Sequence, residues 1–506
     1  MGGIEQHRRV TQKTITRVSL SRRSLLAAAA SAPFVSASAR STQASGAPAR
    51  RLRRDRRPNI VFVITDDLRF DGLGCTGHPF AKTPNIDRIA RKGASFTNFF
   101  TVVPLCSPSR ASFLTGLYPH THRIVNNDRQ GLAETSQTLI TFPRVLHEAG
   151  YESAFIGKWH MGFDDGRRPG FDHWVSFRGQ GLYINPVVNM DDRREQLRGY
   201  MTDFLNERAA RFIARPHQRP FVLFLAHKAV HYPYLPAKRH DSLYTGATYT
   251  PPPVAPDDLP GKSALSRRVP PVDVLRMEGA TPEPQESRRG RPESADEVLR
   301  DQARCLASVD DGMGMILDAL SRIGELDNTL VIFTSDNGYL MGEHGQFDAK
   351  RWAYEESLRI PLVARFPSLL KAGSRHDEMA LNIDIAPTVL ELAGVTAYAK
   401  MHGRSLVPVL RDSRTPWRDS FLAEHFVEKF VPNVPDWQCA RTTGWKYIHF
   451  PGLENLDELY NLAADPKEIH NRINDPGAAE ARERMKAELA RLATETAAPP
   501  PDAKFG

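Results

Sequence analysis

Short, almost continuously apolar runs that alternate with helical patterns constrain the fold of this chain more than any other feature. The clearest runs occupy residues 59–65 (NIVFVIT), 153–156, 221–225 (FVLFL) and 330–334 (LVIFT). Strands covered on both faces have this composition, because neither face of the sheet meets water. Alternating strands and helices build parallel sheets, so we predict an α/β fold with a large, mostly parallel sheet and helices on both faces.

Between the apolar runs at 221–225 and 330–334, the sequence predicts one irregular stretch and one long helix. Residues 295–323 carry apolar side chains at helical spacing and predict a single helix. Within it, Asp310 and Asp311 are expected to be solvated or to cap a neighbouring element. Residues 241–294 hold a Pro-Pro-Pro run and many charges, which is typical of a variable loop insertion.

The pattern changes after residue 395. Residues 420–423 and 446–450 read as strands, and 478–493 as a closing helix. We therefore predict a main domain at 58–395, followed by a smaller α+β subdomain with an antiparallel sheet at 396–506.

The first residues resemble an export leader. Arg22 and Arg23 precede the apolar run 25–30, and Ala37-Ser38-Ala39 forms an A-x-A cleavage pattern. We interpret 1–39 as a twin-arginine signal peptide and 40–57 as a linker, which predicts a periplasmic or secreted bacterial protein. An ordinary secretory signal or a basic tail are the alternatives.

The positive charge of the chain is confined to this leader. The whole chain has a formal net charge of +8, but residues 1–57 hold 13 Lys and Arg against 2 Asp and Glu, which leaves −3 for the remainder. A neutral to acidic mature chain is not expected to bind nucleic acid. No later run approaches the roughly 20 apolar residues that span a bilayer, so no membrane span is expected.

Charged and polar residues follow each of the four predicted strands. In open α/β sheets, ligands bind beyond the carboxyl ends of the strands, so these residues are expected to meet at one rim. In chain order they are Asp66 and Asp67; Gly157, Lys158, Trp159 and His160; His227, Lys228 and His231; and Asp336 and Asn337. Asp66, Asp67, Asp336 and Asn337 form an all-oxygen set, which suits Ca²⁺ or Mg²⁺ better than zinc. Alternatively, these pairs cap helices or form turns.

A cysteine precedes a helix-like segment in Cys106-Ser107-Pro108-Ser109-Arg110. Ser107 suits an N-cap and Pro108 the first helical position, which would place Cys106 at a helix N-terminus that favours anions. Arg110 adds a fixed positive charge one turn away. The alternative for an isolated cysteine is a small buried hydrophobic residue.

The C-S-P-S-R motif and its surroundings resemble the type I sulfatase signature of the alkaline-phosphatase-like superfamily. The resemblance continues through GKWHMG, AHKAVHYPY, SDNG, GEHGQFDAKRWAYEESLRIP and ELYNLAADPKE, and it covers nearly all of residues 58–475. In that family the motif cysteine is converted to formylglycine, an aldehyde that acts as a hydrated diol. The resemblance therefore implies a sulfatase and a formylglycine-generating enzyme as maturation partner.

The resemblance also implies a role for each residue of the rim. Asp66, Asp67, Asp336 and Asn337 would hold a metal, usually Ca²⁺ and less often Mg²⁺, with the modified Cys106 beside it. Arg110 and Lys158 would hold the diol, and His160 would remove a proton from its second hydroxyl. Lys158, His231 and Lys350 would contact sulfate, with His231 or Lys350 protonating the departing alcohol; His344 would contact substrate.

The substrate is the least constrained part of the prediction. The YEESLRIP stretch resembles carbohydrate sulfatases, including those that act on 6-sulfated N-acetylglucosamine, so a sulfated carbohydrate is expected. One alternative is a phosphonate monoester or phosphodiester hydrolase of the same superfamily. Another is a catalytically silent relative that binds sulfated glycans.

Overall fold

The computed structural model describes residues 57–128, 131–249, 261–266, 294–396 and 401–500. The described residues belong to one compact unit. The predicted leader, all but the last residue of the linker, and most of the predicted insertion lie outside the described residues.

The described helices and strands have the following bounds. The helices are α1 (Pro84–Lys92), α2 (Cys106–Thr115), α3 (Pro119–His122), α4 (Leu132–Thr138), α5 (Phe142–Glu148), α6 (Met201–Ala214), α9 (Ala295–Arg322), α10 (Glu355–Leu358), α11 (Ile385–Leu392), α12 (Val407–Arg411) and α13 (Ala479–Thr496). The strands are β1 (Asn59–Thr65), β2 (Ala94–Phe96), β3 (Phe99–Phe100), β4 (Glu152–Gly157), β5 (His173–Ser176), β6 (Val187–Met190), β7 (Arg193–Gln196), β8 (Phe221–Ala226), β9 (Thr329–Ser335), β10 (Leu340–Met341), β11 (Phe347–Ala349), β12 (Leu362–Arg365), β13 (Ser374–His376), β14 (Ala380–Leu381), β15 (Ser420–His425), β16 (Trp437–Thr442), β17 (Trp445–His449) and β18 (Glu458–Asn461).

The main sheet has ten strands in the order β13-β2-β12-β9-β1-β8-β4-β5-β6-β7. The four predicted strands are its centre, where β9, β1, β8 and β4 run parallel as neighbours. Their registers align the carboxyl ends: Thr65 is opposite Ser335, and Ile64 is opposite Ala226. The residues that follow these strands therefore emerge at one rim, which confirms the predicted α/β architecture.

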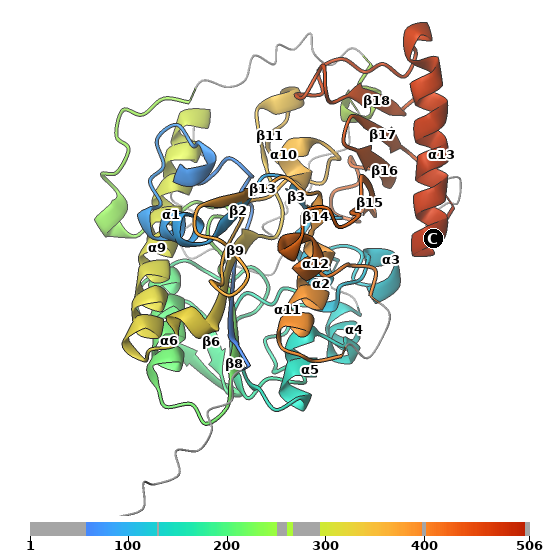
Figure 1. Ribbon diagram of the computed structural model, residues 1–506. Coiled ribbons are helices and arrows are strands. Elements are labelled where there is room, and N and C mark those ends of the chain that lie inside the picture. The colour runs from blue at the N-terminus through green and yellow to red at the C-terminus, as the bar shows by residue number, and fades with distance from the viewer. Residues whose placement is uncertain (1–56, 129–130, 250–260, 267–293, 397–400, 501–506) are drawn as a thin grey trace, which may run out of the picture. The chain divides into compact units, whose positions relative to one another are not determined.

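Side chains of the central strands pack in two hydrophobic cores, one on each face of the sheet. Along β1, Ile60, Phe62 and Ile64 belong to one core, and Val61 and Val63 to the other. Figure 1 shows α2, α5 and α11 on one side of the sheet and α1, α6 and α9 on the other. Because every position of β1 is buried, the strand needs apolar residues on both faces.

The predicted antiparallel sheet near the C-terminus is present. It has the order β15-β16-β17-β18, and α13 packs against it (Figure 1). Met485 and Leu489 of α13 share a core with Phe421 and Cys439 of the sheet, and with Phe100 of β3. The four cysteines of the chain all lie within the described ranges, and none of them forms a disulfide.

Asp310 caps a neighbouring helix, one of the two roles expected for it. This carboxylate, 3% exposed, accepts hydrogen bonds from the backbone N–H groups of Asn85 (3.0 Å) and Ile86 (2.8 Å) in the first turn of α1. Asp311 is exposed instead and pairs with Arg239 and His240.

We expect Asp310→Ala to lower the free energy of unfolding by about 1–2 kcal/mol, because two donors of α1 lose their acceptor. The control Asp311→Ala removes an exposed ion pair and should cost less than about 1 kcal/mol. Urea unfolding followed by circular dichroism measures both, and equal losses would contradict the capping role.

Among the helices of the described ranges, none combines the length and hydrophobicity that crossing a bilayer requires.

Candidate active site

Three carboxylates converge where β1 and β9 end. Asp66, Asp67 and Asp336 are buried, and each offers an oxygen within 4.8 Å of the others. Asp336 Oδ1 accepts the backbone N–H groups of Asp67 (3.1 Å) and Asn337 (2.8 Å), which ties the two strand ends together. Burial and then the neighbouring Asp66 raise the pKa of Asp336 to about 6. Clustered buried carboxylates of this kind favour a bound cation.

The fourth oxygen of the predicted metal set also fits a cation. Asn337 Nδ2 donates to Asp67 Oδ1 (2.6 Å), which fixes the orientation of the amide. Its other atom, Oδ1, is buried and has no hydrogen-bond partner among the described residues. A buried, unpaired carbonyl oxygen beside three carboxylates suits a hard cation such as Ca²⁺ or Mg²⁺. The residues present therefore fit the predicted metal site.

Cys106 lies against this cluster at the first position of α2. Its Sγ atom is 3.4 Å from Asp66 Oδ1 and 2.8 Å from Lys350 Nζ, and the side chain is fully buried. Burial, followed by the Asp66 charge, raises the pKa of the Cys106 thiol far above its ordinary value. The unmodified thiol is consequently a poor source of thiolate.

The expected helix start needs a correction. The N-cap is Leu105, so Ser107 and Pro108 lie inside the first turn and do not begin the helix. Ser107 Oγ donates to the backbone oxygen of His160 (2.7 Å), so it is not available as a cap. Pro108 is tolerated because N–H groups of the first turn have no partner within the helix. Cys106 is at the helix N-terminus, as predicted.

Three cations surround the carboxylates. Arg110 Nε donates to Asp336 Oδ2 (2.9 Å), and Lys350 Nζ donates to Asp67 Oδ1 (2.6 Å). Lys158 Nζ forms a short contact with Asp66 Oδ2. Burial acts to raise the pKa of Asp66, but the positive charges, Lys158 first, hold it well below its ordinary value. Burial opposes the charge of Lys350, yet Asp67 raises its pKa, so Lys350 is protonated at neutral pH.

Both predicted active-site histidines are neutral. Burial and then Lys158 lower the pKa of His160 well below its ordinary value, and burial has the same effect on His231. His231 Nδ1 is 2.7 Å from the backbone oxygen of Tyr232, which can only accept. The Nδ1–H of His231 therefore donates there, and Nε2, 3.7 Å from Asp67 Oδ2, presents its lone pair to the cluster.

His344 contacts a different buried cluster. Its ring stacks on Tyr354 with 3.8 Å between centroids, Nδ1 contacts Lys262 Nζ, and Nε2 is 3.5 Å from Glu356 Oε2. None of its described contacts reaches the carboxylates or Cys106. His227 is likewise buried, with a pKa lowered to about 3 by burial and Arg110. Trp159 and Trp352 are buried and belong to two of the hydrophobic cores, so both are packing residues.

Gln180 is a neighbour of the site that sequence reasoning missed. Its Oε1 accepts from Lys158 Nζ, so it shares that ammonium group with Asp66. Gln180 lies in a loop after β5, outside every motif, and nothing in the sequence marks it.

Comparisons with known proteins identify relatives of the chain. Residues 58–395 match the family model described as Sulfatase, and 342–495 match that of the N-sulphoglucosamine sulphohydrolase C-terminal region. An N-acetylglucosamine-6-O-sulfatase from Bacteroides thetaiotaomicron is 33% identical, over 87% of this chain and 86% of that protein. The N-acetylglucosamine-6-sulfatase of Homo sapiens is 29% identical, over 82% of this chain and 81% of that protein.

Solved structures share the fold. A protein in complex with its substrate D-glucosamine-2-N,6-O-disulfate is 30% identical, with a TM-score of 0.76, over 89% of this chain and 100% of that one. A phosphonate monoester hydrolase of Agrobacterium radiobacter has a TM-score of 0.69 over 87% of this chain and 96% of that one. At 23% identity, it shows the fold alone.

Proposed function

The chain belongs to the sulfatase family and is a carbohydrate sulfatase, a sulfuric ester hydrolase, and from this premise we propose how it acts. The nucleophile is a formylglycine formed from Cys106 by a formylglycine-generating enzyme. Asp66, Asp67, Asp336 and Asn337, together with the modified residue, would hold a Ca²⁺ ion.

One observation carries this proposal: the Cys106 side chain contacts both a carboxylate of the candidate metal set and the Lys350 ammonium group. A sulfate ester brought to this position would meet a nucleophile and fixed positive charge together. The raised pKa of the thiol argues against a thiolate nucleophile, since protonated sulfur is weakly nucleophilic. In a hydrated aldehyde at position 106, one hydroxyl can attack sulfur and expel the alcohol of the ester. Deprotonation of the second hydroxyl then re-forms the aldehyde, which breaks the C–O bond to sulfate and releases it.

The neighbouring residues suit the roles that remain. The metal, when bound, supplies electrostatic stabilisation of charge on the sulfate oxygens. Arg110 and Lys158 orient the side chain at position 106, and neutral His160 can accept a proton from its second hydroxyl. Lys158, His231 and Lys350 contact sulfate. Of His231 and Lys350, the protonated Lys350 is better suited to protonate the departing alcohol.

The substrate we propose is a 6-sulfated glucosamine residue of a glycan. Two relatives are named for N-acetylglucosamine 6-sulfate, and one solved relative holds D-glucosamine-2-N,6-O-disulfate as its substrate. All three share more than four fifths of this chain in their alignments. We further propose that residues 58–395 form the catalytic domain and residues 396–506 a smaller subdomain. We also propose that the protein is exported to the periplasm or exterior by the twin-arginine route.

The test compares sulfate release from N-acetylglucosamine 6-sulfate with release from an aryl sulfate and cleavage of a phosphonate monoester. We expect kcat/KM for the sugar sulfate to exceed the other two by about 100-fold or more, since only the sugar uses the full site. A preference for the phosphonate monoester would contradict the proposed reaction. Tight binding of the sugar without turnover, by protein whose tryptic peptide 93–110 carries the aldehyde mass, would indicate a silent binding protein.

A further inference from the structure

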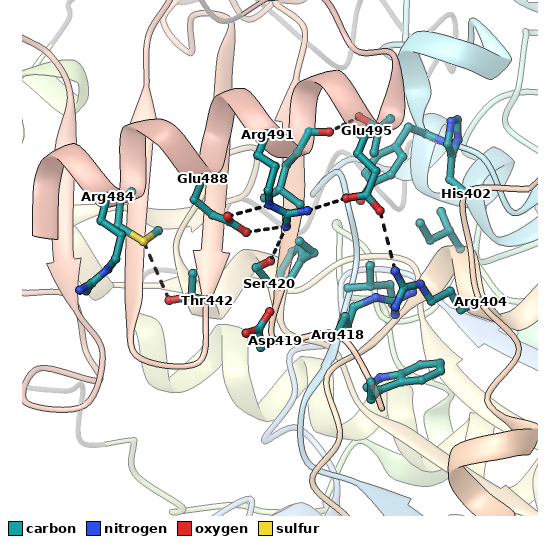
Figure 2. Close-up of a pocket in the computed structure, with 18 residues that line it drawn as sticks. His402, Arg404, Arg418, Asp419, Ser420, Thr442, Arg484, Glu488, Arg491 and Glu495 are labelled. Atoms are coloured by element: carbon teal, nitrogen blue, oxygen red, sulfur yellow. Dashed lines mark hydrogen bonds and ion pairs between the residues drawn. The ribbon is translucent and has the colours of Figure 1, made fainter. Parts of the chain in front are cut away.

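A pocket lies away from the candidate active site. It has a volume of about 620 Å³ and lies between α13, strands β15 and β16, and the segment 402–418. No member of the carboxylate cluster, and neither Cys106 nor its surrounding cations, lines it. Figure 2 shows Arg484, Glu488, Arg491 and Glu495 along the side of α13 that faces the pocket, with Arg404 and Arg418 across from them.

Four arginines line the pocket, and two of them are held in place by ion pairs with neighbouring residues. Arg491 donates to Glu488 Oε1 and Glu495 Oε2, each at 2.7 Å, and reaches Ser420 Oγ at 3.2 Å. Arg418 pairs through both terminal nitrogens with the buried carboxylate of Asp384. These two guanidinium groups are neutralised by their partners.

The other two arginines remain available to a ligand. Arg484 is exposed and has no hydrogen bond or ion pair in the described part of the chain, and Arg404 reaches only Glu495, at 3.8 Å. The side chain of Asp419, which lines the pocket and is drawn between Arg484 and Arg404 in Figure 2, also makes no hydrogen bond within the described ranges. The pocket thus offers the Arg484 guanidinium, which has no partner in the described ranges, at one end and the Arg404 guanidinium, held by a long ion pair to Glu495, at the other. The Asp419 carboxylate is an acceptor between them.

An aromatic surface completes the lining. Trp417 donates from Nε1 to the backbone oxygen of Met379 (2.8 Å), and Arg418 stacks over its ring at 4.9 Å, so the ring orientation is fixed. A flat apolar ring among hydrogen-bonding groups suits a ligand with apolar C–H faces and many hydroxyls. An apolar ligand would remove water from the guanidinium groups and would offer no acceptors in place of the hydrogen bonds that the groups make to water.

We propose that this pocket is a second, non-catalytic binding site for a sulfated saccharide. Arg484 and Arg404 bind sulfate groups, Asp419 accepts from sugar hydroxyls, and Trp417 contacts a ring face. Guanidinium groups pair well with oxyanions because their N–H donors match two oxygens at once. The choice of sulfate as the anion rests on the proposed function. The pocket would hold a longer glycan to the enzyme while another residue of that glycan is hydrolysed.

The test measures binding of a heparin hexasaccharide by isothermal titration calorimetry to Cys106→Ala protein, which keeps turnover out of the measurement. Adding Arg404→Ala and Arg484→Ala should weaken binding about tenfold, as expected from losing two charge-assisted contacts. The matched control, Arg193→Ala with Arg322→Ala, removes two exposed arginines that do not line the pocket and should change binding less than about twofold.

Three results would overturn the inference: no weakening by the Arg404→Ala, Arg484→Ala pair, equal weakening by both pairs of substitutions, or equally tight binding of the fully desulfated hexasaccharide. In protein that keeps Cys106, the Arg404→Ala, Arg484→Ala pair should leave hydrolysis of N-acetylglucosamine 6-sulfate unchanged, because that monosaccharide does not need the second site. Pocket-dependent binding without sulfate release from any sugar would overturn the proposed function and leave this site standing. Normal sulfate release with unaltered binding would overturn only the site.

Discussion

Cys106→Ala should lower kcat for sulfate release by roughly 10⁴-fold or more, because it removes the proposed nucleophile and leaves only substrate binding and electrostatic stabilisation. Cys106 is fully buried beside Asp66 and Lys350, so no other described cysteine can replace it. Sulfate release from N-acetylglucosamine 6-sulfate, measured by ion chromatography, gives the rate.

The controls separate chemistry from folding. Cys305→Ala and Cys439→Ala remove buried thiols in two other cores and should leave kcat within about threefold, although both cost some stability. Cys106→Ser keeps a hydroxyl but cannot supply the second one, so it should perform one attack at most and then stop. Repeated turnover by the serine variant, or more than a few per cent of activity in the alanine variant, would contradict the formylglycine mechanism.

Asp336→Asn should lower both Ca²⁺ affinity and activity, with kcat/KM falling by about 10²–10³-fold. Asp336 lies at the centre of the cluster: it binds Arg110, accepts two backbone N–H groups, and contributes one of three converging carboxylates. Calcium titration calorimetry on protein freed of metal by a chelator measures the affinity, and sulfate release measures the activity. The control Asp327→Asn changes an exposed carboxylate and should alter neither quantity.

The pH dependence of the metal-free protein follows from the same residue. The pKa of Asp336 is raised to about 6 in the folded chain, against 3.8 when unfolded, so the folded state binds the extra proton between these values. Its contribution to stability is therefore lost as pH rises from about 4 to about 6. Ca²⁺ affinity should rise over the same range, because the metal competes with that proton. Calcium affinity that is flat from pH 4.5 to 7 would show that Asp336 is not a ligand.

The sequence predicts the rim of the sheet well, because position along a parallel strand determines where the next residues emerge. Asp66 and Asp336 are separated by 270 residues in the chain, yet the pairing of Thr65 with Ser335 makes their meeting a consequence of strand register. The all-oxygen set follows from the same logic. The place of Cys106 at a helix N-terminus rests instead on the helix-start residues Ser107 and Pro108, which the structure puts inside the first turn of α2.

The sequence predicts contacts between loops poorly. His344 belongs to a motif with catalytic neighbours, but its left-handed backbone, with φ of 55°, accompanies a ring stacked on Tyr354 beside Lys262. Lys262 comes from the irregular segment that offered no periodicity, and Gln180 reaches Lys158 from a loop without a motif. Such contacts depend on tertiary placement, which neither hydrophobic period nor residue type encodes.

The complete burial of Cys106 has a consequence for the order of events in the cell. An enzyme that converts this cysteine needs the thiol and its flanking backbone, and the folded chain encloses both within α2 and the carboxylate cluster. If Cys106 is converted as proposed, conversion must come before the sheet closes, while the chain is still being synthesised or is newly released. If the leader directs the twin-arginine route, which carries folded proteins, this places conversion in the cytoplasm. Under the proposed export and mechanism, a chain that folds too early would leave the cytoplasm with an unmodified Cys106 and would remain inactive.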